Sequence, residues 1–385
     1  MVKRRIHLRR ITGILIFLLV CGTMSVSATE IPNLTGSWTR IFIEKFYPDS
    51  GFENRTGDLG SYQITGQEGR AYIGVLNYHD PKTNINGTEL FSGALSPDGL
   101  TYEVDNEGSG ISFGEFVSDH EFYNYMLFPE RMLFPEQGPA IIVYHLVKSG
   151  TNASPSVKVP DLIGTWNLTH NRKNSTSTTG LITIDKQQGR IWSGTEEIRD
   201  EDGTWINVTL AGTVGDSGRV YAASENGAFM FGSLTGNDSI QSAFLIPGDT
   251  DGTYVIDREL TKNGASIPQS DLSYPVMTGD WKIDNRKVIQ NGKITDLGPL
   301  SDEWLSFSNQ TGRFFTAVRH NQTAGVSPEM EESGIFRVPD EAFLTDADSS
   351  IEIYHVIDNS TIEAIVNRKD NNALLYLDLL TRRPE

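Results

Sequence analysis

The sequence predicts an all-β protein in which three tandem eight-stranded up-and-down antiparallel β-barrels follow an N-terminal signal peptide. Three observations support this prediction. One motif recurs three times, short alternating runs of apolar and polar residues follow each copy, and turn dipeptides rather than helical periods separate the runs. The motif reads I-P-N-L-T-G-S-W at 31–38, V-P-D-L-I-G-T-W at 159–166 and Y-P-V-M-T-G-D-W at 274–281. Three copies predict three structural units.

Residues 1–28 have the features of a secretory signal peptide. Five basic residues lie within the first ten positions, an apolar run follows at 11–20, and Val26-Ser27-Ala28 is a small-x-small cleavage signal. The apolar run is about half the length of a membrane span, which favours cleavage near Ala28 over a retained anchor. A lipid anchor at Cys21 is a further alternative, but Val20 stands where lipoproteins carry a small residue. We therefore expect a secreted or cell-surface protein without a membrane span in its mature chain.

Charge and cysteine content exclude several classes of protein. Five of the 32 Lys and Arg residues lie in the signal peptide, so 27 remain against 50 Asp and Glu, a formal net charge of −23. A nucleic-acid-binding protein needs clustered basic charge, so this class is excluded. The only cysteine, Cys21, leaves with the signal peptide, so the mature chain has neither a disulfide nor a thiol nucleophile. Its barrels must be stable through packing alone.

The first unit, residues 29–150, is expected to hold eight strands. The first strand begins at Trp38, and seven alternating runs follow it. They lie at 60–65, 70–78, 88–95, 101–105, 111–117, 121–128 and 140–147. Between the last two runs, the residues at 126–131 are repeated almost unchanged at 132–137. This duplication most simply lengthens a loop whose Leu-Phe pairs cap a barrel mouth or pack between units, and the alternative is a lid or a membrane-touching tip.

The second unit, residues 156–263, has the most regular pattern. Its eight runs lie at 165–170, 180–185, 190–198, 204–212, 219–224, 228–234, 240–246 and 253–260. Dipeptides that favour tight turns, such as Ser217-Gly218 and Asn226-Gly227, join these runs. A meander of eight short strands closes naturally into a barrel, because closure leaves no unpaired edge.

Two glycosylation sequons orient the strands of the second unit. A glycan cannot enter a core, so Asn167 and Asn207 must point outward. Because side chains alternate along a strand, the neighbours of both residues should point inward. The expected interior set is Trp166, Leu168, Ile206, Val208 and Leu210.

The third unit, residues 272–385, begins its first strand at Trp281. Seven further runs lie at 303–307, 313–318, 334–338, 342–345, 351–357, 361–367 and 373–380. The acidic segment at 327–333 is expected to be a solvated connection. Linkers rich in Ser, Thr, Asn, Gly and Pro lie at 149–155 and 263–273, and we expect few contacts to cross them.

Eleven N-x-S/T sequons follow the signal peptide, and export makes all of them available for glycosylation. They lie at Asn33, Asn54, Asn86, Asn152, Asn167, Asn174, Asn207, Asn237, Asn309, Asn321 and Asn359. We expect several of them to carry glycans in a host that has the required enzymes.

A second signature recurs in the turn between the second and third strands of each unit. It reads Q-E-G-R at 67–70, Q-Q-G-R at 187–190 and Q-T-G-R at 310–313, so its basic residues are Arg70, Arg190 and Arg313. An aromatic residue follows each Arg, at Tyr72, Trp192 and Phe314. Catalytic sites seldom recur in every copy of a repeat, so this signature predicts a structural role.

The units resemble the calycins, the group that contains the lipocalins and avidins. The resemblance rests on G-x-W in the first strand, an eight-stranded meander, and a basic residue two positions after a Leu in the last strand. It implies three cation–π pairs that close one end of each barrel, Trp38 with Lys148, Trp166 with Lys262 and Trp281 with Arg382. The second lipocalin motif, a disulfide and the biotin-binding polar set of avidins are missing. The chain thus resembles a secreted surface protein, of an archaeal type, built from calycin-like repeats.

No motif in the sequence indicates catalysis or a cofactor. The seven histidines lack metal-ligating spacings, and no nucleophile-elbow, phosphate-binding or dinucleotide-binding motif occurs. The segments 200–203 and 249–252 imitate the start of a calcium loop, but Ala211 and Leu260 stand where such a loop needs its last Glu. Hairpin turns are the better interpretation of both segments. We therefore expect no metal, no cofactor and no enzymatic activity.

Two classes of function remain. The first is a cell-surface or envelope protein whose barrels serve as spacers and contacts, with other surface proteins as partners. The second is an extracellular binding protein that holds a small hydrophobic ligand or a glycan in a barrel mouth, and an interior cavity of several hundred Å³ would favour it. The first unit is preferred for such a site because of its aromatic residues Tyr72, Tyr78, Tyr102, Phe113, Phe122, Tyr123 and Tyr125. The three similar units with short turns favour the first class.

Overall fold

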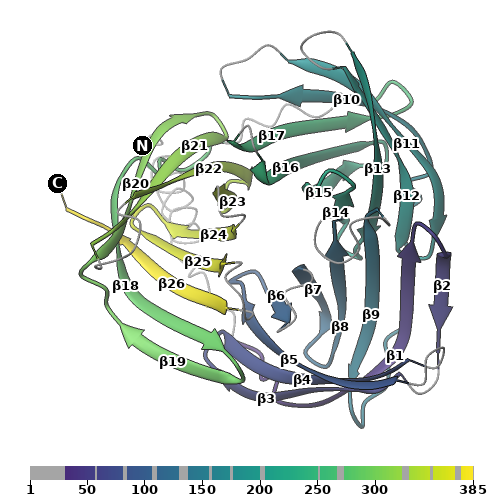
Figure 1. Ribbon diagram of the computed structural model, residues 1–385, viewed down its shortest axis with the longest axis horizontal. Coiled ribbons are helices and arrows are strands. Elements are labelled where there is room, and N and C mark those ends of the chain that lie inside the picture. The colour runs from purple at the N-terminus through teal and green to yellow at the C-terminus, as the bar shows by residue number, and fades with distance from the viewer. Residues whose placement is uncertain are drawn as a thin grey trace, which may run out of the picture. The chain divides into compact units, whose positions relative to one another are not determined.

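The structure is a computed structural model, and the part of the chain that it describes consists of strands, turns and connections (Figure 1). The described residues are 31–56, 59–80, 85–105, 111–129, 138–155, 158–173, 177–199, 204–249, 252–266, 273–322, 329–346, 350–368 and 374–384. The expected signal peptide, the repeated hexapeptide at 132–137 and most of the second linker lie outside these residues. Three closed antiparallel barrels follow one another in the chain, which confirms the predicted fold class.

Barrel 1 closes through the pairing of its first strand with its last. Its strands are β1 (Gly36–Tyr47), β2 (Gly51–Arg55), β3 (Ser61–Glu68), β4 (Ala71–Asp80), β5 (Ile85–Leu95), β6 (Leu100–Asp105), β7 (Ile111–Ser118), β8 (Glu121–Phe128) and β9 (Ala140–Lys148). The first half of β1 pairs with β3, while its second half, beyond a bulge after Arg40, pairs with β2. The sequence analysis missed β2, because this short strand adds to the long β1 and shows no alternating pattern of its own.

Barrel 2 contains eight strands that match the eight predicted runs. They are β10 (Gly164–Asn171), β11 (Thr178–Gln188), β12 (Ile191–Arg199), β13 (Trp205–Val214), β14 (Arg219–Ser224), β15 (Phe229–Gly236), β16 (Ser239–Asp249) and β17 (Gly252–Thr261). Four members of the expected interior set are buried, but Ile206 is 38% exposed. Ile206 shares the inward parity of Val208 and Leu210, yet it lies near the start of β13, beyond the packed interior.

Barrel 3 repeats the plan of barrel 1. Its strands are β18 (Gly279–Gln290), β19 (Lys293–Gly298), β20 (Glu303–Thr311), β21 (Phe314–Asn321), β22 (Glu329–Val338), β23 (Glu341–Asp346), β24 (Ile351–Asp358), β25 (Thr361–Arg368) and β26 (Leu374–Arg382). The sequence analysis missed β19, which pairs with the second half of β18 as β2 does with β1. It was also wrong about the acidic segment 327–333, because residues 329–333 belong to β22 and Glu332 is buried.

Each barrel has its own apolar interior, and the repeated Trp lies within it. Trp38, Trp166 and Trp281 are at most 1% exposed, and each packs in a separate cluster of buried side chains. Burying a side chain of this size contributes several kcal/mol, so these residues anchor the first strands.

A fourth apolar cluster is shared by all three barrels. It is built from outward-facing side chains of the strands, so both faces of these strands are covered. Phe113 of barrel 1 lies 5.2 Å from the ring of Tyr221 and 5.0 Å from that of Phe231 in barrel 2, and Phe231 stacks on Phe343 of barrel 3 at 4.4 Å. The expectation that few contacts link the units is therefore wrong, and residues 33–385 form one compact unit.

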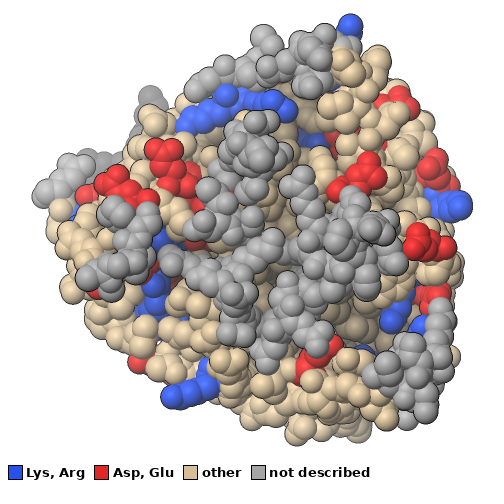
Figure 2. All heavy atoms as spheres, viewed as in Figure 1, with Lys and Arg blue, Asp and Glu red and all other residues tan. Residues whose placement is uncertain are grey.

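Among the residues that the structure describes, no helix has the length and apolar character needed to cross a membrane. On the face shown in Figure 2, acidic and basic side chains are interspersed with uncharged ones.

Candidate functional site

The two repeated signatures of the sequence bind one another in every barrel. The apolar residue of the first motif is Leu34, Leu162 or Met277, and its carbonyl accepts the indole N–H of the following Trp at 2.8–2.9 Å. Its backbone N–H donates to Oε1 of Gln67, Gln187 or Gln310 at 2.7–2.8 Å. The Gln of one signature thus fixes the chain entry of the other, which explains why both recur together.

A basic side chain covers each Trp. Lys148 Nζ lies 5.7 Å from the ring centroid of Trp38, Lys262 Nζ lies 4.7 Å from that of Trp166, and the Arg382 guanidinium lies 4.9 Å from that of Trp281. These are the three pairs expected from the resemblance, and all lie within the range of cation–π attraction.

The repeated Arg residues join neighbouring barrels. Arg70 lies 3.4 Å from Glu363 of barrel 3, and the Arg190 guanidinium lies 3.8 Å from the ring centroid of Tyr123 in barrel 1. Arg313 forms an ion pair with Asp257 of barrel 2. Every barrel therefore uses its signature Arg to contact another barrel, in agreement with a structural role.

The aromatic residues proposed for a ligand site in barrel 1 do not form one set. Tyr72 and Phe122 point into the barrel interior, whereas four others belong to the cluster shared between barrels. These four are Tyr102, Phe113, Tyr123 and Tyr125. Tyr78, the remaining member, is half-buried on β4. Strand alternation separates the group onto two faces, and the neighbouring barrels cover the outer face, so these residues do not line a common mouth.

The interior of barrel 1 contains a buried carboxylate that sequence reasoning missed. Glu103 Oε1 accepts hydrogen bonds from the hydroxyls of Tyr62 and Tyr72, and its Oε2 accepts one from Asn124. Burial raises the pKa of Glu103, and these three donors oppose the rise. The hollow beside this group, which Tyr144 also lines, has a volume of about 20 Å³. This is close to the space of a single water.

The interior of barrel 2 contains a charge-balanced pair. Arg258 binds Glu196 through two hydrogen bonds of 2.9 and 2.7 Å, and its guanidinium lies over the ring of Phe244. His170 lies 3.5 Å from the same carboxylate. Burial, followed by the charge of Arg258, lowers the pKa of His170, so this ring is neutral at pH 7. One positive and one negative charge therefore face each other in a buried interior.

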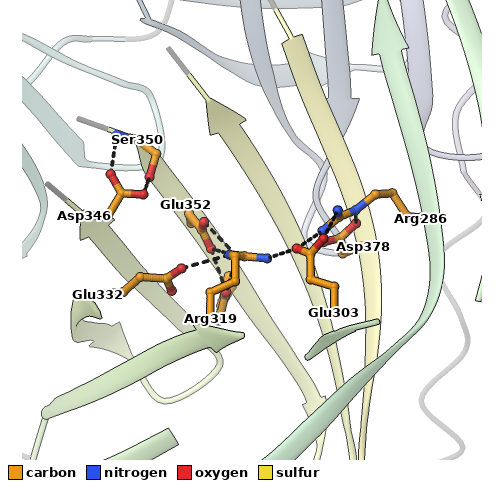
Figure 3. A network of polar contacts seen from close by, with 9 residues as sticks. Arg286, Glu303, Arg319, Glu332, Asp346, Ser350, Glu352 and Asp378 are labelled. Carbon is orange, nitrogen blue, oxygen red and sulfur yellow. Dashed lines mark hydrogen bonds and ion pairs between the residues drawn. The ribbon is translucent and has the colours of Figure 1, made fainter. Parts of the chain in front are cut away.

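The interior of barrel 3 contains a larger network centred on Arg319 (Figure 3). Its guanidinium donates to Glu303 at 2.9 Å, to Glu332 at 3.0 Å and to both oxygens of Glu352 at 2.8 and 2.7 Å. The bonds to two Arg residues outweigh burial and lower the pKa of Glu303 to about 2. Burial, and then the charge of Glu352, raises the pKa of Glu332 to about 8.

The network continues to the neighbouring strands. Arg286 on β18 binds both Glu303 and Asp378, each through two hydrogen bonds of 2.6–2.9 Å. Asp346 on β23 accepts hydrogen bonds from the backbone N–H and the hydroxyl of Ser350. In Figure 3 the side chains of Glu332, Asp346 and Glu352 come from three consecutive strands of barrel 3. This group is the strongest candidate in the described part of the chain for holding a metal ion.

A second hollow lies where all three barrels meet. Its lining includes Phe113, Phe231 and Phe343 together with Arg219 and Arg337, and its volume is about 10 Å³. Arg219 of barrel 2 forms an ion pair with Asp98 of barrel 1. The junction is thus a filled contact rather than a cleft for a ligand.

Of the two sequence segments that imitate calcium loops, only the ends of 249–252 lie among the described residues. Asp249 pairs with Gly252 in the hairpin between β16 and β17, as the hairpin interpretation predicts, and residues 200–203 lie outside the described residues. The acidic network of barrel 3 carries no such sequence signal, because its charged members are spread over seven strands.

Neither the family models nor the curated proteins include a match to this chain. Among solved structures, a DUF3598-family protein of unknown function from Nostoc punctiforme is similar over 58% of this chain and 96% of its own, with 8% identity and a TM-score of 0.27. A double mutant of transferrin binding protein B from Haemophilus parasuis is similar over 90% of this chain and 75% of its own, with 6% identity and a TM-score of 0.21. Values this low carry no argument about function.

Proposed function

We propose that this protein is a secreted cell-surface protein whose three barrels act together as one rigid spacer and contact unit, without a catalytic site or a small-molecule ligand. The observation that carries the proposal is the filling of the barrels. In each barrel a basic side chain lies over a buried Trp, and buried polar groups occupy each interior as well. Two hollows lined by described residues, one of about 20 Å³ in barrel 1 and one of about 10 Å³ where the barrels meet, are far smaller than the roughly 300–1,000 Å³ of ligand pockets.

The exposed sequons support a location outside the cell. Nine of the eleven sequon asparagines are exposed, Asn321 is half-buried, and Asn174 lies outside the described residues. Glycans attached at these nine positions would project from the surface without disturbing a core. Such a coat suits a protein that presents its outer surface to other surface molecules.

The proposal is tested on protein purified from the cells that make it naturally. We expect the N-terminus to begin near Thr29, native mass spectrometry to show glycans but no bound small molecule, and an antibody against the chain to label intact cells. A stoichiometric bound compound would contradict the absence of a ligand. Labelling only after the cells are permeabilised would contradict the surface location.

One observation favours the alternative of a binding protein. The hollow in barrel 1 brings Glu89, Glu103, Asn124 and Tyr144 together with apolar side chains, which is the composition of a small ligand site. If barrel 1 opens around a hydrophobic ligand, a fluorescent fatty-acid analogue should bind with one-to-one stoichiometry. We expect no saturable binding of this probe.

A further inference from the structure

Three carboxylates in barrel 3 converge on one point. Glu332 on β22, Asp346 on β23 and Glu352 on β24 are at most 2% exposed, and each offers an oxygen within 4.8 Å of the other two. Glu332 and Asp346 are directly opposite in the pairing of β22 with β23, and Glu352 is opposite Leu344 two residues earlier on β23. Register therefore places the three side chains on the same inner face.

The interior of barrel 3 has an excess of negative charge. Among the residues that the structure describes, its buried network contains five carboxylates and two guanidiniums, a formal excess of three negative charges when every carboxylate is ionised. The carboxylates are those of Glu303, Glu332, Asp346, Glu352 and Asp378, and the guanidiniums are those of Arg286 and Arg319. Barrel 2 buries one Arg against one Glu in its interior pair and is balanced. Buried like charges are costly, so this group of carboxylates is expected to take up a positive partner, either a proton, as the raised pKa of Glu332 indicates, or a cation.

An independent observation shows where that partner would lie. Glu332 Oε1 accepts a hydrogen bond from Arg319, but Glu332 Oε2 is buried and has no hydrogen-bond partner among the described residues. A buried carboxylate oxygen without a donor is a strong acceptor site for a cation. This unpaired oxygen, Glu332 Oε2, belongs to the group of Glu332, Asp346 and Glu352. It lies on β22, in the segment that the sequence analysis expected to be a solvated connection.

We propose that Glu332, Asp346 and Glu352 bind one hard divalent cation of the calcium class inside barrel 3. All the ligand atoms are carboxylate oxygens, which select Ca²⁺, Mg²⁺ or Mn²⁺ rather than softer metals. A Ca²⁺ ion bonds oxygen at about 2.4 Å, so one ion can reach three oxygens that all lie within 4.8 Å of one another. Calcium also tolerates irregular coordination, as expected for side chains fixed by strand register.

The cation would tie three consecutive strands together and neutralise most of the excess charge. Its effect should be on the stability of barrel 3, so the proposal is independent of the spacer function. A ligand that binds only the folded state raises stability in proportion to the logarithm of its concentration above Kd.

The test uses the full mature chain after treatment with EDTA. Calcium chloride, titrated by isothermal calorimetry, should bind at one site and raise the Tm. Terbium should bind in its place and give luminescence sensitised by Tyr354, whose hydroxyl donates to Glu352 at 2.6 Å, and added calcium should remove that signal. The Glu332→Gln variant should weaken calcium binding about tenfold or more, because ligand charge sets affinity.

The matched control is Glu331→Gln, which removes the same charge one residue away on the exposed face of β22. It should leave calcium binding and the Tm shift unchanged. If Glu332→Gln does not fold, Asp346→Asn takes its place in the same assays. The proposal is overturned if the wild-type protein shows no saturable heat, or if both β22 variants lose calcium equally, since binding would then reside on the acidic surface.

Discussion

At the scale of single residues, three glycines show how closely the repeats are matched. In each barrel an aromatic side chain two residues after the signature Arg points inward. Gly93, Gly212 and Gly334 each lie against this ring on the neighbouring strand. A Cβ atom at these positions would lie 2.2 Å from Tyr72, 2.2 Å from Trp192 and 2.3 Å from Phe315, respectively. The inward aromatic of barrel 3 is therefore Phe315, whereas the sequence analysis paired Arg313 with Phe314. The aromatic ring requires the absence of a side chain on the neighbouring strand.

We expect Gly212→Ala to destabilise the protein by about 1–3 kcal/mol, the usual cost of forcing extra volume into a packed core. The new methyl group would meet both the Trp192 ring and the carbonyl of Tyr221. Thermal unfolding monitored by circular dichroism measures the change. Gly236→Ala, whose methyl would meet only the Ser239 hydroxyl at 3.1 Å, is the control and should have little effect. Equal losses in the two variants would contradict the packing argument.

At the scale of strands, buried charges link elements that are distant in the chain. Glu196 on β12 and Arg319 on β21 both lie six residues after a signature Arg, and their main partners, Arg258 and Glu352, come from different strands. In barrel 2 the bidentate pair connects β12 to β17 across the interior. Such a pair specifies the arrangement of strands more than it adds net stability.

A double-mutant cycle on this pair should show strong coupling. Removing one partner, by Glu196→Gln or Arg258→Met, leaves an uncompensated polar group in the interior and should cost about 3–5 kcal/mol. The combined variant should lose less than the sum of the single losses. Urea unfolding of all four proteins gives the coupling energy. Additive losses would show that the pair does not act as a unit.

At the scale of the whole molecule, the barrels share an apolar cluster and exchange signature Arg contacts. One of these contacts depends on pH, since burial between barrels 1 and 3 outweighs the charge of Arg70 and raises the pKa of Glu363 to about 7. The folded protein therefore holds this proton more tightly than the unfolded chain, where the value is 4.5. Its contribution to stability falls as pH rises from about 4.5 to about 7 and is constant above that range.

Glu363→Gln cannot ionise, so the Tm of this variant relative to wild type should increase as pH rises from 5 to about 7.5. Differential scanning calorimetry in a series of buffers measures both proteins. Glu331→Gln, an exposed carboxylate of the same barrel, should run parallel to wild type. A parallel curve for Glu363→Gln as well would mean that the carboxyl already ionises at its ordinary pKa in the folded protein.

The shared cluster also predicts how the molecule responds to cleavage of a linker. With a protease site inserted in the first linker, at 149–155, the cut chain should still elute as one particle in size-exclusion chromatography, because Phe113, Phe231 and Phe343 hold the barrels together. Independent folding of each barrel stays a prediction. Release of a separate fragment of about 14 kDa would show that the interfaces are weaker than their packing indicates.

The sequence by itself determined the number of units, the all-β class and nearly all of the strands, and its resemblance to the calycins implied the three Trp-cation pairs. These features depend on local patterns, namely turn dipeptides, alternation and a motif repeated at a fixed strand position. Local patterns of this kind do not depend on contacts with the neighbouring barrels.

Only the tertiary structure decided which face of each strand is buried and by what. Tyr102 and Phe113 resemble interior residues, yet they point away from their own barrel, because neighbouring barrels cover its outer face. In the sequence, Glu332 resembles a solvated residue. In the structure it lies inside barrel 3, where the guanidinium of Arg319 donates a hydrogen bond to its carboxylate. A period of two identifies a strand with two different faces, but it cannot tell inside from outside when both faces are buried. Charge balance inside a barrel likewise depends on side chains from many strands, which only the closed sheet brings together.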